Sequence, residues 1–66
     1  NTLIPLDMLF IDEAGKIVRI EQRTVPHSLR AIRSGQPVAA VLELNAGTTS
    51  RLAIEPGDRV IHPAFN

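Results

Sequence analysis

The sequence predicts a mainly β domain, a small antiparallel sheet or partly open barrel of about four strands with one short helix before the last strand. Residues 6–11 form an apolar run of strand length, and residues 16–22 and 38–44 contain the alternation typical of half-buried strands. Residues 44–61 combine a strand end, a short helix, a tight turn and a closing strand with little chain between them. Every earlier segment must pack against this last unit.

The first strand, residues 6–11, is apolar on both faces apart from Asp7, which predicts a central place in the sheet. The turn that follows contains Gly15, which can adopt a positive φ. Residues 16–22 should return antiparallel to the first strand, with Val18 and Ile20 facing the core. The two segments are therefore expected to form a β-hairpin.

The middle of the chain is less regular. Residues 23–37 contain Pro, Gly and three Arg side chains, and a loop of this length in a compact domain is either functional or a covering arm. Residues 38–44 then form a third strand that places Leu42 and Leu44 on one face.

The short helix after the third strand has two possible caps, Asn45 or Thr48. Beyond the helix, Leu52 and Ile54 are expected to point into the core. Pro56, Gly57 and Asp58 form the predicted structural turn, of type II, with Asp58 accepting nearby amides. A last strand should then place Val60 and His62 on one face.

The composition limits both size and function. The chain has 66 residues, no Cys, two His, and seven Lys and Arg balanced by seven Asp and Glu. Binding to phosphates needs clustered basic side chains, so we expect no nucleic acid partner. No apolar segment reaches the roughly 20 residues of a membrane span. Thiolate metal sites are excluded and two His are too few for an imidazole site, so we expect no metal and no cofactor.

Residues 1–66 are expected to form a single β-rich domain. A domain this small buries only about 60% of the surface of its unfolded chain, so it needs additional stabilisation. With no disulfides, the sources left are good packing, further chain or self-association. We therefore expect residues 1–66 to be the C-terminal portion of a larger domain whose N-terminal strands precede it, or to form a homodimer through open sheet edges.

Three motifs together resemble a known family. They are NTLIPLDMLFID at residues 1–12, VLELNAG at residues 41–47 and LAIEPGDRV at residues 52–60. They resemble the domain of unknown function 192 family of small bacterial and archaeal proteins. The resemblance implies a larger compact β-rich domain with no established activity. Because many members carry export signals, it also implies a periplasmic or extracellular location, while a cytoplasmic one stays open.

Asp7 is the leading candidate for a ligand-binding residue, because an acid inside an apolar strand needs polar partners. Asn1 and Thr2 lie close in sequence and could form a polar pocket with it. The alternative is structural: Asp7 accepts backbone or side-chain hydrogen bonds and fixes the start of the strand. Both interpretations stay open at the level of sequence.

The long loop supplies the other candidates. Arg23, Arg30 and Arg33 could form the rim of an anion-binding groove, or a solvated basic face. His27 lies in the same loop and is a further candidate for ligand binding. Residues 47–50 could hold an anion on free helix amides, although they lack the phosphate-loop pattern and capping is the simpler reading. We identify no catalytic residue set.

These features favour a non-enzymatic binding or interaction module whose partner is an unknown small molecule or protein. The alternative is a swapped-hairpin DNA-binding regulator, because residues 51–60 also resemble an element of those dimers. A third possibility is a hydrolase that uses Asp7 or His27. Convergence of those side chains in one pocket would support the hydrolase.

Overall fold

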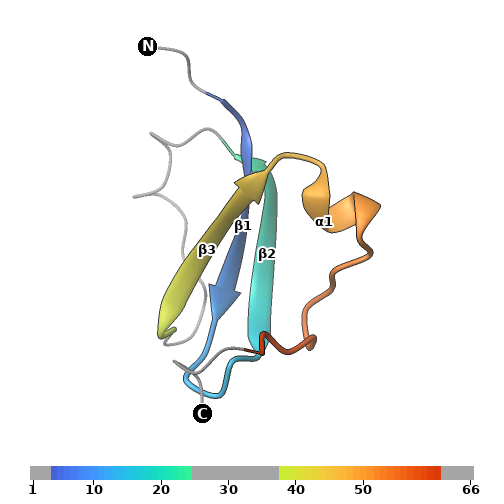
Figure 1. Cartoon of the computed structure of the whole chain (residues 1–66). Helices are drawn as coiled ribbons and strands as arrows, with labels where there is room; N and C mark the ends of the chain where they lie inside the picture. The colour runs from blue at the N-terminus through green and yellow to red at the C-terminus, as the bar shows by residue number, and fades with distance from the viewer. Residues whose placement is uncertain (1–3, 25–37, 62–66) are drawn as a thin grey trace.

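The computed structural model of the chain describes residues 4–24 and 38–61 (Figure 1). Three antiparallel strands form one sheet in the order β2-β1-β3. The elements are β1 Leu6–Ile11, β2 Ile17–Thr24, β3 Ala40–Asn45 and the short helix α1 Thr48–Arg51. The predicted mainly β class is confirmed, with three strands in place of about four.

Strand β1 is the centre of the sheet, as its apolar sequence predicts. Leu9 and Ile11 are each 2% exposed on one face, and Met8 and Phe10 are buried on the other. Leu9, Ile11 and Ile17 form the core cluster. A strand buried on both faces cannot alternate apolar with polar residues, which explains the continuous apolar run.

The β1–β2 hairpin is confirmed, with a turn of the expected kind. The Gly15 N–H donates to the Asp12 carbonyl oxygen at 3.0 Å, and Gly15 has a φ of 86°. One oxygen of the Asp12 carboxylate accepts the N–H groups of Ala14 and Lys16, both at 2.9 Å. The Asp side chain thus fixes the loop that glycine allows to turn.

A β-bulge changes which residues of β2 face the core. Phe10 pairs with Arg19, whereas Ile11 pairs with Ile17, so β2 contains one extra residue at Val18. Ile17 is therefore 2% exposed and joins the core, and Ile20 packs against it. The prediction that Val18 and Ile20 form the inner face was wrong for Val18, because a bulge shifts a simple alternation by one residue.

The core is completed from the C-terminal segment. Ile54 and Val60 pack against the core cluster. The prediction that Leu52 also points inward was wrong, because Leu52 is the C-cap residue of α1 and is 55% exposed. Leu42 lies on the same face of the sheet as its partner Leu9, as expected, but it is 40% exposed.

Residues 57–60 replace the predicted last strand with a short pairing along the start of β2. Ile17 exchanges hydrogen bonds of 2.7 and 2.8 Å with Gly57 and Asp58, and the Val60 N–H donates to the Gly15 carbonyl oxygen at 2.7 Å. Lys16 and Arg59 form an isolated antiparallel β-bridge between residues 57–60 and the start of β2. Residues 57–60 and β3 therefore lie at opposite ends of the order, and no pairing joins them within the described part of the chain. His62 lies outside the described residues.

Helix α1 ends in a Schellman motif with an unusual residue. The Ile54 N–H donates to the Thr49 carbonyl oxygen at 2.9 Å, and the Ala53 N–H donates to that of Ser50 at 3.2 Å. Ala53 has a φ of 56°, the left-handed position that glycine usually occupies. An L side chain is strained there by roughly 1–2 kcal/mol.

We expect Ala53→Gly to raise the free energy of unfolding by about 1 kcal/mol, since it relieves this strain. The matched control is Ala14→Gly, also at an exposed alanine in a turn but without a positive φ. Ala14→Gly relieves no strain and only raises the conformational entropy of the unfolded chain, so it should leave the free energy of unfolding unchanged or lower it. Urea unfolding followed by circular dichroism measures both, and equal effects of the two substitutions would contradict the assignment of strain to Ala53.

Candidate functional site

Asp7 forms the most extensive polar junction described in the protein. Its side chain is fully buried. Oδ2 accepts the Thr49 N–H at 2.9 Å, the Thr49 hydroxyl at 2.8 Å and the Gly47 N–H at 3.1 Å. Oδ1 accepts the Arg23 N–H at 3.1 Å. One carboxylate therefore connects β1, β2 and the start of α1.

The junction also caps the helix. Gly47 is the N-cap residue, has a left-handed φ of 93° and contributes no side-chain cap. Neither Asn45 nor Thr48 supplies the cap predicted from sequence. Asp7 accepts the amides at the helix start instead, and a negative charge is favourable there because the first amides of a helix are unsatisfied donors.

A second bulge in β2 brings the fourth donor to Asp7. Leu6 pairs with Thr24 and Met8 with Glu21, so Gln22 and Arg23 together lie opposite Asp7. Arg23 has a φ of 55°. The bulge lets the backbone N–H of Arg23 reach the Asp7 carboxylate, a role typical of bulges that redirect local groups.

Thr49 connects this junction to the surface. Its side chain is 1% exposed, and its Oγ1 accepts a hydrogen bond from Gln22 Nε2 at 2.9 Å. Gln22 Nε2 also lies 3.1 Å from Ser50 Oγ. Since the Thr49 hydroxyl accepts from Gln22, its own proton is directed at Asp7.

The environment of Asp7 favours its charged form. Burial alone raises the pKa of Asp7 and is the largest single influence. The hydrogen bonds from Thr49, Arg23 and Gly47 act the other way, and together they hold the pKa of Asp7 below its ordinary value. Within the described residues, every buried side-chain nitrogen and oxygen has a hydrogen-bond partner.

This geometry gives Asp7 a structural role. Its carboxylate has no exposed surface, and both oxygens already accept protein donors. A hydrolase would need this group to reach substrate or a water molecule. The other proposed ligand-binding residues lie outside the described residues: Asn1, Thr2, His27, Arg30 and Arg33.

Pro56, Gly57 and Asp58 lie in a tight turn with the hydrogen bonds of type II geometry. The Asp58 N–H donates to the Glu55 carbonyl oxygen at 3.0 Å, and Gly57 has a φ of 99°. Asp58 Oδ2 accepts the Glu55 N–H at 2.9 Å. The turn directs residues 57–60 back along β2.

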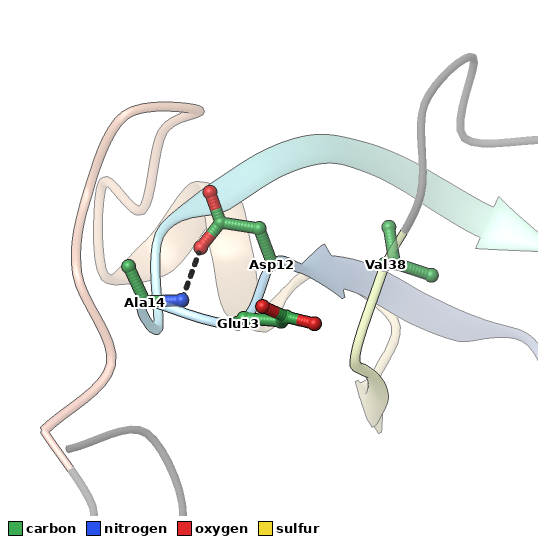
Figure 2. Close-up of a pocket in the computed structure, with 4 residues that line it drawn as sticks. All are labelled: Asp12, Glu13, Ala14 and Val38. Atoms are coloured by element: carbon green, nitrogen blue, oxygen red, sulfur yellow. Dashed lines mark hydrogen bonds between the residues drawn. The ribbon is translucent and has the colours of Figure 1, made fainter.

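An acidic hollow lies between the hairpin turn and the chain leading into β3. Its described lining residues are Asp12, Glu13, Ala14 and Val38, around a volume of about 430 Å³ (Figure 2). The Asp12 carboxylate already accepts the backbone amide of Ala14. Among residues 4–24 and 38–61, no group of three or more His, Asp or Glu side chains could hold a metal ion.

A second hollow, here called the apolar hollow, lies between β3 and the C-terminal segment. It is a shallow depression that is open to solvent, with a volume of about 430 Å³. Six apolar side chains from all three strands and the C-terminal segment line it, with Asp58 and Arg59 as the charged groups. The six are Leu9, Ile17, Leu42, Leu44, Ile54 and Val60.

The edge of β3 borders this hollow. Among the described residues β3 pairs only with β1, so its outer backbone edge has no described partner. Val41 is 43% exposed on one face and Leu42 is 40% exposed on the other. Sequence analysis missed this combination; the exposure of a strand edge depends on which segments lie beside it, and strand periodicity does not contain that information.

The motifs of the chain match a family model over residues 1–62, and the family is described as Uncharacterized ACR, domain of unknown function 192. The chain belongs to this family. The match confirms the resemblance seen in the three sequence motifs and covers both the Asp7 junction and the apolar hollow.

A solved structure supports the relationship. The chain is 60% identical to a protein from Sinorhizobium meliloti 1021 whose crystal structure is described as that of a candidate transcription regulator. The TM-score is 0.78, and the match covers 89% of this chain and 46% of that one. The chain thus spans about half the length of that protein. A search of curated proteins found no match.

The part of the chain that the structure describes includes no helix long and apolar enough to cross a membrane.

Proposed function

We propose that the domain is a non-enzymatic interaction module that binds an extended polypeptide segment along β3 and over the apolar hollow. The observation that carries the proposal is that β3, whose outer edge has no partner among residues 4–24 and 38–61, lies beside an apolar hollow. An added strand would satisfy the backbone edge and place alternate side chains in the hollow. A small apolar ligand would fill the hollow but leave the edge without a partner.

The chemistry of the edge supports a peptide rather than a reactive substrate. Asp7 and Thr49 are buried and engaged with each other, so neither is presented to the hollow. The hollow itself has mainly aliphatic walls, with Asp58 and Arg59 contributing charge. Aliphatic walls favour apolar side chains, and the β3 backbone favours an extended chain.

We expect a peptide that alternates Val and Thr, with Lys at each end, to bind this edge. Titration into the isotope-labelled chain should shift NMR signals of β3 and slow hydrogen exchange of its outer amides. Leu42→Glu should weaken binding at least about tenfold, equivalent to about 1.4 kcal/mol, because it places a charge in the apolar hollow. Arg51→Glu, on exposed α1, is the matched control and should leave binding unchanged.

A probe with Pro at its centre tests the backbone pairing, because Pro cannot donate to a strand ladder. Binding of both probes with equal affinity would reduce the site to a hydrophobic surface. No β3 response at millimolar peptide would contradict the proposed function.

A DNA-binding regulator is the second candidate, and the name of the 60% identical protein is what favours it. The chain has seven basic and seven acidic side chains, so it lacks the excess of positive charge that phosphate binding needs. Retention on duplex DNA that falls steeply with salt would support the regulator. Retention indistinguishable from that of a neutral control protein would count against it.

A periplasmic or extracellular location forms part of the proposal and is supported by the export signals implied by the family resemblance. Fusion of the complete natural protein to alkaline phosphatase tests it, since this reporter is active only after export. An inactive fusion that is stably produced would place the protein in the cytoplasm.

A further inference from the structure

We propose that residues 52–60, here called the C-terminal strap, open as a unit and thereby deepen the apolar hollow. The inference rests on the proposed function, because it concerns the regulation of the same site. In the structure the hollow is shallow, and two residues that line it, Leu9 and Ile17, are each only 2% exposed. A groove deep enough to take whole side chains of a bound peptide therefore requires part of the wall to move.

The strap forms the wall of the hollow that faces β3. It leaves the end of α1 and returns to the start of β2 (Figure 1). Ile54 and Val60 are its half-buried side chains, and both line the hollow and pack against the core cluster. The other residues of the strap are exposed. Movement of the strap would therefore uncover Leu9 and Ile17 without disturbing the pairing of β1 with β2 and β3.

The contact between the strap and β2 has the features of a segment that opens locally. Ile17 exchanges two backbone hydrogen bonds with Gly57 and Asp58, which are both exposed. The Val60 N–H donates to the Gly15 carbonyl oxygen. Few buried apolar side chains together with hydrogen bonds at the surface characterise segments that open at a lower free energy than the whole domain.

The other end of the strap contains the hinge. Helix α1 is held by the bonds from Thr49 to the buried carboxylate of Asp7, so it stays in place while the strap moves. Leu52 is the C-cap residue, and Ala53 follows with its left-handed φ of 56°. Hinges absorb a backbone change at a few residues at the end of an element. Rotation of Ala53 to an ordinary negative φ would release strain, which lowers the free energy needed to open the strap.

Native-state hydrogen exchange of the unmodified chain measures this opening. The amides of Ile17, Gly57 and Val60 donate across the contact between the strap and residues 15–17. They should exchange together, at least about tenfold faster than the most protected amides of β1. Ile17 is the sharpest reporter, because it is a buried residue of β2. Exchange of these three amides at the rate of the β1 amides would overturn the proposal.

A disulfide can lock the strap, since the chain has no Cys of its own. Lys16 and Arg59 face each other in an antiparallel bridge with a hydrogen bond on either side. The Cα atoms of such a pair lie about 4.5 Å apart, within disulfide range. In the double variant Lys16→Cys, Arg59→Cys, oxidation should remove the difference in exchange rate between the three amides and β1. The reduced form of the same variant is the matched control and should keep that difference.

The alternating Val-Thr peptide connects the strap to the proposed function. Peptide added to the unmodified chain should favour the open strap, and so speed exchange of the three amides while it slows exchange of the outer β3 amides. The oxidised double variant should bind the peptide at least about tenfold more weakly than the reduced form. Slower exchange at both places, or equal affinity of the two forms, would overturn control by the strap. No β3 response to the peptide in the unmodified chain would contradict the proposed function, whereas exchange of the three amides without peptide would still decide whether the strap opens.

Discussion

Replacing Asp7 with Ala is expected to lower the free energy of unfolding by at least about 4 kcal/mol, since each of four donors left without an acceptor costs about 1 kcal/mol or more. The substitution removes the acceptor for three backbone amides and one hydroxyl. A domain of this size is stabilised by only about 3–5 kcal/mol. The variant should therefore be largely unfolded at room temperature.

Far-ultraviolet circular dichroism and urea unfolding measure this effect. Asp12→Ala is the matched control, because Asp12 also accepts two backbone amides, but those bonds are exposed to solvent. Its loss should cost only about 1 kcal/mol. If the two substitutions were equally mild, the carboxylate of Asp7 would not be the junction that holds β1, β2 and α1 together.

Asp7 also shows where inference from sequence reaches its limit. The sequence identifies it as a buried acid that needs partners, and the alternative of hydrogen bonding to backbone and side-chain groups matches what the structure describes. It does not identify those partners, which lie 16, 40 and 42 residues away along the chain. Residues next to the helix were therefore predicted to cap it, although the capping group is the Asp7 carboxylate, which belongs to β1.

The same reasoning separates the correct from the incorrect strand assignments. β1 was predicted with its observed bounds because a continuous apolar run is a local signal. Val18 was misplaced because the bulge arises from pairing between strands. The exposure of Leu42 depends on what lies beside β3, which periodicity within one strand does not encode.

Acid should destabilise the domain through Asp7 specifically. The pKa of Asp7 is lower in the folded protein than its ordinary value, so the unfolded chain binds this proton more readily. The stabilisation is therefore complete above the unfolded Asp pKa of about 3.9. It is lost as the pH falls through the lower pKa of the folded state.

This pH dependence is best measured as a difference between two folded variants. In the Ala53→Gly background, which we expect to offset part of the loss, Asp7→Asn should retain one oxygen acceptor but cannot ionise. Urea unfolding from about pH 6 to about pH 2.5 gives the free-energy difference between the two variants at each pH, and contributions of the other carboxylates common to both cancel. The difference should shrink toward low pH, because Asp7 then loses its charge. A free-energy difference that does not change with pH would mean that the charge of Asp7 does not stabilise the fold. A neutral acceptor at this position would then stabilise it equally well.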